Sequence, residues 1–170
     1  MTTYRVEHLF ECSETTYWET LFFDEEYNRR LFYDELHFHE WRELERKDEG
    51  ARVKRHVRAV PPLRDLPGPL KSVIGEGAGY EERGLFTRET KRYEADVITN
   101  TLADRVKVTL AIYTKPAGDA RCHRIAEGSV TAKILMIGGM LEQKMISDLT
   151  RSYEKSADFT NRFVREKGLT

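Results

Sequence analysis

The sequence is poor in cysteine and has no long run of apolar residues. Its two cysteines, Cys12 and Cys122, are too few for a disulfide framework, and no CxxC spacing indicates a zinc site. The longest apolar runs, such as residues 134–137, fall far short of the roughly 20 residues that span a bilayer. The opening stretch MTTYRVEHLFEC lacks the basic start and apolar centre of a signal peptide. We therefore expect a cytoplasmic protein with reduced cysteines.

Familiar catalytic and cofactor motifs are also missing. No Ser-His-Asp, Cys-His or paired-carboxylate arrangement stands out, and GEGAG at 75–79 lacks the strand before it and the helix after it that a nucleotide fingerprint needs. His37 and His39 would project to one side of a strand, but His56 lies too far along the expected ladder to complete a metal site. We expect no metal, no cofactor and no catalytic residue, which favours a binding protein over an enzyme.

Charge is unevenly distributed, although the formal net charge is only -1. Residues 1–50 carry 14 acidic and 6 basic side chains, whereas residues 51–170 carry 15 acidic and 22 basic. This division indicates either a basic patch for nucleic acid or anionic lipid, or two portions that pair in the fold. A hairpin turn at 49–50 would set Glu45 opposite Lys54, which favours a partly neutralised sheet surface. We expect no nucleic-acid partner.

Hydrophobic periodicity predicts one domain over residues 1–170. Residues 4–12 alternate as a strand, and Ser13 and Asp24 then open two short helices that reach about residue 36. Six further strands are predicted at 38–48, 51–60, 80–90, 91–101, 105–115 and 121–134, the last with a bulge at Glu127 and Gly128. The proline-rich connection 61–79 has a helical turn at 69–74, and long connections of this kind often cover a site as a lid.

The passage VTAKILMIGGMLEQKM, residues 130–145, leads from the last strand into a long helix with no polar loop between them. From Gly139 to about Glu166 apolar residues recur at helical spacing, without proline or further glycine. Such a helix is close to 40 Å long at a rise of 1.5 Å per residue, so only a large sheet can bury one side of it. The order of elements predicts an α+β fold in which an antiparallel sheet of about seven strands curls around the C-terminal helix.

This order resembles the START-like, or helix-grip, superfamily of Bet v 1-like proteins over nearly the whole chain. The resemblance is carried by the helix pair SETTYWETLFFDEEYNRRLFYDEL and by GSVTAKILMIGGMLEQKMISDLTRSYEKSADFTNRFV. The chain is most similar there to an uncharacterised bacterial family, and PLRDLPGPLKSVIG with VITNTLADRVKVTLAIYTKP is similar in layout to PRELI-type phospholipid-transfer domains. The resemblance implies that Gly138 and Gly139 free the backbone where the last strand turns into the helix. It also implies that the first and last strands pair, which would make Cys12 and Cys122 neighbours.

The resemblance further implies a cavity between sheet and helix that binds, and by extension transports, a hydrophobic small molecule. A lipid or fatty-acyl compound is the favoured class, with transient membrane contact, and a polyketide cyclase or aromatase-like enzyme is the alternative. The residues expected to line the ligand are Arg55, His8, Phe10, Val57, Val97, Val108, Leu110, Leu149, Ser152 and Tyr153. Small side chains such as Ser152 leave room in the middle of the helix, unless bulky Trp18, Phe38 or Tyr93 fills it.

Two polar residues interrupt apolar strand faces. A buried, unpaired Arg55 would cost several kcal/mol, so it needs a partner such as Glu40, Glu82 or the carboxylate or phosphate group of a ligand. A structural ion pair or a side chain that reaches the cavity rim is the competing interpretation. For His8 we expect a neutral, hydrogen-bonded histidine, and the enzyme alternative would use His8 or Arg55 in acid-base or enolate chemistry.

Overall fold

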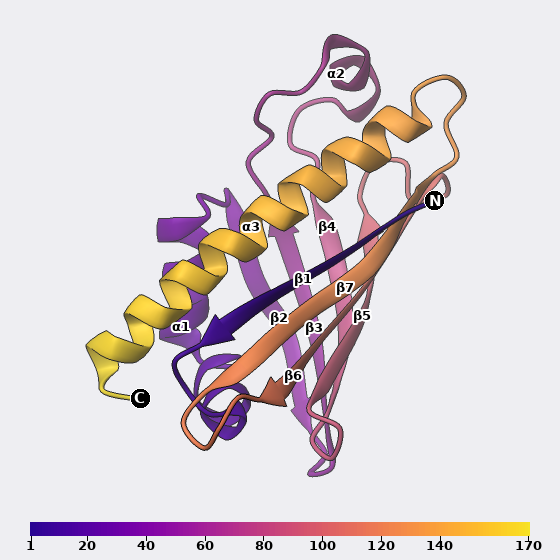
Figure 1. Ribbon diagram of the computed structural model, residues 1–170. Coiled ribbons are helices and arrows are strands. Elements are labelled where there is room, and N and C mark those ends of the chain that lie inside the picture. Colours follow the sequence, from indigo (N-terminus) through magenta and orange to yellow (C-terminus); the bar gives the residue numbers. More distant parts are fainter.

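The computed structural model describes residues 1–170 as a curved antiparallel sheet that grips one long helix (Figure 1). The elements are β1 (Thr2–Phe10), the π-helical turn η1 (Thr16–Leu21), α1 (Glu25–Arg29), the π-helical turn η2 (Arg30–Glu35), β2 (Glu40–Asp48), β3 (Arg52–Val60), α2 (Gly68–Ile74), β4 (Tyr80–Thr87), β5 (Arg92–Thr99), β6 (Val106–Pro116), β7 (Cys122–Ala132) and α3 (Gly138–Lys167). The strands form one sheet in the order β1-β7-β6-β5-β4-β3-β2, and all neighbours are antiparallel. The predicted α+β helix-grip fold is confirmed.

The long helix α3 runs diagonally across the sheet and packs mainly against β1 and β7 (Figure 1). These two strands are the first and the last of the chain, and they pair from Thr2 opposite Val130 to Phe10 opposite Cys122. No helix has the combination of length and apolar character that crossing a membrane requires. The two helical segments after β1 open as expected, because Ser13 Oγ accepts from the Thr16 N–H at 3.1 Å and Asp24 Oδ2 accepts from the Tyr27 N–H at 2.8 Å.

Two separate apolar clusters fill the two ends of the interior. The aromatic core, which includes Phe10, Trp18, Phe86, Tyr93 and Phe163, joins the short helices to the C-terminal part of α3. The aliphatic core consists of Leu70, Val106, Val108, Val130 and Leu141 and lies at the other end of that helix. Trp18 and Tyr93 therefore do fill interior space, but only at one end.

The uneven charge distribution is resolved by pairing within the fold. Near the C-terminal end of α3, Arg165 lies 3.0 Å from Glu11, and Lys167 lies 3.0 Å from Glu26. Arg88 similarly forms ion pairs with Glu19, at 2.9 Å, and with Asp48 at the end of β2, at 2.7 Å. The second interpretation of the charge division is thus confirmed. Exposed pairs of this kind contribute about 0–1 kcal/mol each, so they add specificity more than stability.

The predicted register of the β2–β3 hairpin is wrong. Glu45 lies opposite His56 rather than Lys54, because the turn closes between the Glu49 N–H and the Arg52 carbonyl, 2.8 Å apart. The ladder also shifts between residues 43 and 45, where β2 contains a bulge. The bulge predicted in β7 at Glu127 and Gly128 is absent, since β7 pairs without interruption on both sides.

The start of β2 also differs from prediction. The strand begins at Glu40 rather than at residue 38, and His37 has a left-handed φ of 59°. His37 and His39 therefore precede the strand instead of sharing one of its faces.

The passage from β7 into α3 contains a loop that the sequence did not predict. β7 ends at Ala132, residues 133–137 form a turn, and α3 begins at Gly138. A side chain at Gly138 would overlap the Ala132 carbonyl, whereas Gly139 faces open space. Gly138 thus permits close approach rather than backbone freedom, and the left-handed residue of the turn is Met136, with a φ of 69°.

Candidate functional site

The middle of α3 contributes no buried side chain. Its buried residues lie within 138–142 and 156–164, and none lies between 143 and 155, a stretch about 20 Å long. Apolar side chains of this stretch, such as Leu149 and Tyr153, are only half-buried against the two cores. The helix is therefore fully buried only near its two ends, and its middle is half-exposed.

The central row of the sheet opposite the helix contains three small residues among six. The strand registers place Tyr4, Gly128, Leu110, Ala95, Gly84 and Arg55 in one row across β1, β7, β6, β5, β4 and β3. The ring of Tyr4 stacks on that of Tyr153 with centroids 6.1 Å apart, which places this row level with the middle of α3. Gly128, Ala95 and Gly84 therefore lie level with the half-buried middle of α3.

The two glycines of this row allow tyrosine hydroxyl groups to lie against the sheet. A side chain at Gly84 would overlap the Tyr93 hydroxyl, and one at Gly128 would overlap the Thr109 carbonyl and lie 3.0 Å from the Tyr4 hydroxyl. The buried Tyr4 hydroxyl makes no hydrogen bond of standard geometry, although the Tyr153 hydroxyl is near enough to lower its pKa. An unpaired buried hydroxyl costs about 1–3 kcal/mol, so this group is a candidate donor to a bound molecule.

Three phenols and one carboxylate converge on the interior, and we call Tyr4, Tyr80, Tyr153 and Glu82 the tyrosine cluster. Burial raises the pKa of all three phenols, that of Tyr4 to about 12, and the Glu82 carboxylate raises each further. The phenols consequently stay protonated at neutral pH and can donate hydrogen bonds.

Arg55 is buried beside this cluster and is paired with Glu82. Its Nη2 lies 3.5 Å from Glu82 Oε1, and its Nη1 donates to the Phe22 carbonyl at 3.3 Å. The Tyr93 hydroxyl donates to the same Glu82 oxygen at 2.5 Å. Burial opposes the Arg55 charge, but Tyr93 and Glu82 raise its pKa above the ordinary value. Of the partners considered for Arg55, the structure thus shows Glu82, while Nε remains without a partner.

Arg124 is the second buried cation, and it was not predicted from the sequence. Its guanidinium lies 5.0 Å from the ring centroids of Phe10 and Tyr153, and it donates to Ser156 Oγ, to the Tyr153 carbonyl and to His8 Nδ1. No carboxylate lies within ion-pair distance of it. The alternation of residues 122, 124 and 126 toward the interior was the signal that could have identified it.

His8 is neutral and hydrogen-bonded, as the sequence predicts. Because a guanidinium can only donate, Nδ1 must accept from Arg124 at 3.1 Å, and the ring proton lies on Nε2. Burial, and then the Arg124 charge, lower the pKa of His8.

The residues expected to line a ligand do not all lie together. Phe10 and Val57 are fully buried. Val108 belongs to the aliphatic core, and Val97 packs against it. Four more residues are half-buried around the middle of the interior: Leu110, Leu149, Ser152 and Tyr153. Arg55 and His8 lie on strands β3 and β1, which are separated by four others. One ligand group cannot contact both.

Cys12 and Cys122 are neighbours where β1 and β7 meet, as the resemblance implied. Both thiols are free and fully buried, and they lie close enough to influence each other's pKa. This contact, together with burial, raises the pKa of Cys122. Buried cysteines of this kind are unreactive.

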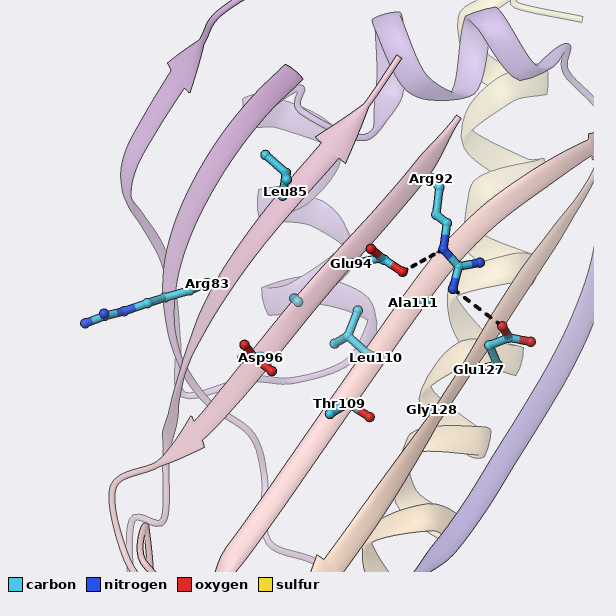
Figure 2. A pocket seen from close by; sticks show the side chains of 11 residues that line it. Arg83, Leu85, Arg92, Glu94, Asp96, Thr109, Leu110, Ala111, Glu127 and Gly128 are labelled. Atoms are coloured by element: carbon cyan, nitrogen blue, oxygen red, sulfur yellow. Dashed lines mark hydrogen bonds and ion pairs between the residues drawn. The ribbon is translucent and has the colours of Figure 1, made fainter. Parts of the chain in front are cut away.

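A hollow of about 540 Å³ lies on the outer face of the sheet, on the side away from α3 (Figure 2). Charged side chains line much of it. Arg92 forms two ion pairs there, with Glu94 at 2.8 Å and with Glu127 at 3.7 Å. Its charged lining and these internal pairs make it a poor site for an apolar ligand. The interior under α3 remains the candidate site.

Comparison with models of protein families identifies the family to which the chain belongs. The model of a family described as "Protein of unknown function (DUF2505)" matches residues 6–164. The chain belongs to this family. No curated protein matches it significantly.

Solved structures share the fold at low sequence identity. The chain is 13% identical to TTHA0849 from Thermus thermophilus, with a TM-score of 0.67 and coverage of 98% of this chain and 99% of that one. It is 11% identical to the Zhui aromatase/cyclase from a Streptomyces species, with a TM-score of 0.66 and coverage of 98% and 96%. It is 16% identical to a norcoclaurine synthase point mutant from Thalictrum flavum, with a TM-score of 0.64 and coverage of 98% and 96%. These similarities confirm the helix-grip fold.

Proposed function

We propose that this protein binds a hydrophobic small molecule between the sheet and α3, with a lipid or fatty-acyl compound as the favoured class. The observation that carries the proposal is the lack of buried side chains between residues 143 and 155 of α3, opposite Gly84, Ala95 and Gly128 on the sheet. Protein interiors are normally close-packed, and an apolar ligand would complete the packing here. Use of the interior is supported by the fold shared with norcoclaurine synthase, which is also solved in complex with dopamine and hydroxybenzaldehyde.

The polar end of the ligand would be held by the tyrosine cluster. The unpaired Tyr4 hydroxyl can donate to a carboxylate or carbonyl oxygen. Arg55 lies on β3, separated from the strand of Tyr4 by four others, so it would contact a second polar group of the ligand; its Nε is free and its bond to Glu82 is long at 3.5 Å. His8 is the least suited of the expected residues, since its Nδ1 already accepts from Arg124.

A cyclase or aromatase-like enzyme is the second candidate, and the tyrosine cluster is the observation that favours it. Protonated phenols in a buried site can stabilise an enolate oxygen as charge develops on it. The Zhui aromatase/cyclase shares the fold. Such an enzyme should lose turnover of a poly-β-ketone substrate in Tyr153→Phe while still binding the substrate, whereas a binding protein shows no turnover at all.

The test is native mass spectrometry of the freshly purified protein, before and after incubation with fatty acids and mixed lipids, followed by solvent extraction. Ser152→Trp would fill the middle of the interior, and Ser147→Trp, on the exposed face of the same helix, is the matched control. We expect a discrete bound species in the wild type and in Ser147→Trp, and its loss in Ser152→Trp. A wild-type protein that carries no ligand under any of these conditions would overturn the proposal.

A further inference from the structure

The loop between β7 and α3 presents two large apolar side chains to solvent. Leu135 and Met136 are 90% and 94% exposed, and the loop protrudes at one end of the molecule (Figure 1). Met140 and Met1 are also exposed, and the Met1 amino group lies 3.2 Å from Glu142 at the start of α3. Isolated exposed apolar residues are ordinary, but a contiguous group on a protrusion marks an interaction site.

This exposure is built into the loop and does not result from poor packing. Ile134 and Ile137, on either side of the exposed pair, both pack against the aliphatic core. The Lys133 N–H donates to the Arg105 carbonyl at 2.8 Å. Met136 has a left-handed φ of 69°, which is strained for any residue but glycine. The backbone thus holds two apolar side chains outward at some energetic expense.

We propose that residues 133–137, together with Met140, form a docking tip that inserts into the surface of a lipid bilayer. Residues 133–140, which would insert, contain one cation, Lys133, and no carboxylate, so insertion of the tip itself buries no acidic side chain of this segment and brings a positive charge to anionic lipids. A protein partner fits less well. A stable protein interface needs roughly 20–30 residues a side, and a narrow protrusion cannot supply them.

The position of the tip connects it to the proposed ligand site. Leu70 is part of the aliphatic core and Ile74 packs on it, so α2 contacts the same core as Ile134 and Ile137. Docking would therefore bring the 61–79 connection to the bilayer, where a hydrophobic ligand enters or leaves. This last step rests on the proposed function, but the docking itself does not.

The test is co-flotation with vesicles of phosphatidylcholine, with and without a minority of phosphatidylglycerol. The variant combines Leu135→Ser with Met136→Ser, which leaves Ile134 and Ile137 in place. The matched control combines Leu44→Ser with Ile98→Ser, which removes two apolar side chains of 42% and 45% exposure elsewhere. We expect the wild type and the control to float, most strongly with phosphatidylglycerol, and the tip variant to lose at least about tenfold in vesicle affinity.

Three results would overturn the docking proposal: a wild type that does not float, a tip variant that floats as well as the wild type, or a control that loses as much affinity as the tip variant. Ligand retention is measured by native mass spectrometry on the same samples. A protein that retains ligand but does not float refutes only the docking tip, and one that floats without ever carrying ligand refutes only the proposed function.

Discussion

Replacing Glu82 by glutamine should destabilise the protein strongly, because the Arg55 cation then stays buried without a counter-charge. The two side chains are only 6% and 13% exposed. The remaining hydrogen bond of Arg55 goes to the Phe22 carbonyl, and its Nε has no partner. Breaking a buried ion pair by removing one partner costs about 3–5 kcal/mol. This is a large share of a typical unfolding free energy of about 5–15 kcal/mol.

The assay is urea unfolding followed by tryptophan fluorescence, with thermal unfolding as a second measurement. For a chain of this size the expected loss corresponds to a fall in Tm of about 6–20 °C. The double variant Arg55→Met with Glu82→Gln should regain most of the stability, since replacing both members of a buried pair is often neutral. Glu94→Gln, which removes an exposed partner of Arg92, is the control and should cost less than about 1 kcal/mol.

Two outcomes would refute this reasoning. If Glu82→Gln costs less than about 1 kcal/mol, the Arg55 charge does not depend on this carboxylate. If the double variant is as unstable as the single one, the loss comes from the hydrogen bond of Tyr93 to Glu82 or from packing, and not from an uncompensated cation.

Three further predictions concern local features. The wild type should lose stability as pH falls below about 6.5, because the pKa of His8 is lower in the folded protein than in the unfolded chain, which therefore binds the proton first. The contribution of His8 to this loss should vanish in His8→Gln. Equal losses of stability between about pH 7.5 and 5.5 in both proteins would contradict the prediction. Asp24→Ala should cost about 1 kcal/mol in urea unfolding by removing the acceptor for the Tyr27 N–H, and Asp24→Asn should restore most of it. Gly138→Ala should cost about 1–3 kcal/mol because its methyl group would overlap a backbone carbonyl, whereas Gly139→Ala should gain up to about 1 kcal/mol, and similar values for both would be inconsistent with the structure.

The fold could be predicted because its signals are local. Alternation over residues 105–115 and an uninterrupted helical pattern after Gly139 are visible in a single sequence. The β2–β3 register could not be predicted, because it depends on the turn geometry around residues 49–52 and on a bulge at Leu44 that no glycine or proline announces. The loop at 133–137 was missed because its residues are apolar, and a turn is normally expected to be polar.

The candidate site was predicted only in part, because it depends on registers between distant strands. Arg55 was identified, and Glu82 was one of the partners considered for it. Gly84 and Gly128 carry no local signal of their role, since they become one row only when β4 and β7 take their places in the sheet. Arg124 could have been identified, because residues 122, 124 and 126 alternate toward the interior.

The way α3 is anchored links ligand binding to stability and to the membrane tip. At its start, Glu142 accepts from the Thr2 hydroxyl at 2.7 Å and from the Ala132 N–H at 2.8 Å; at its other end, Phe163 belongs to the aromatic core. A ligand under the half-buried middle would stabilise the fold by about 2.7 kcal/mol at a concentration of 100 times its Kd. Release of the ligand gives up that stabilisation, and a bilayer promotes release only if the docked protein binds the ligand less tightly than the free protein does. The proposed insertion of Leu135 and Met136 acts at the end of the helix where the aliphatic core also contacts α2.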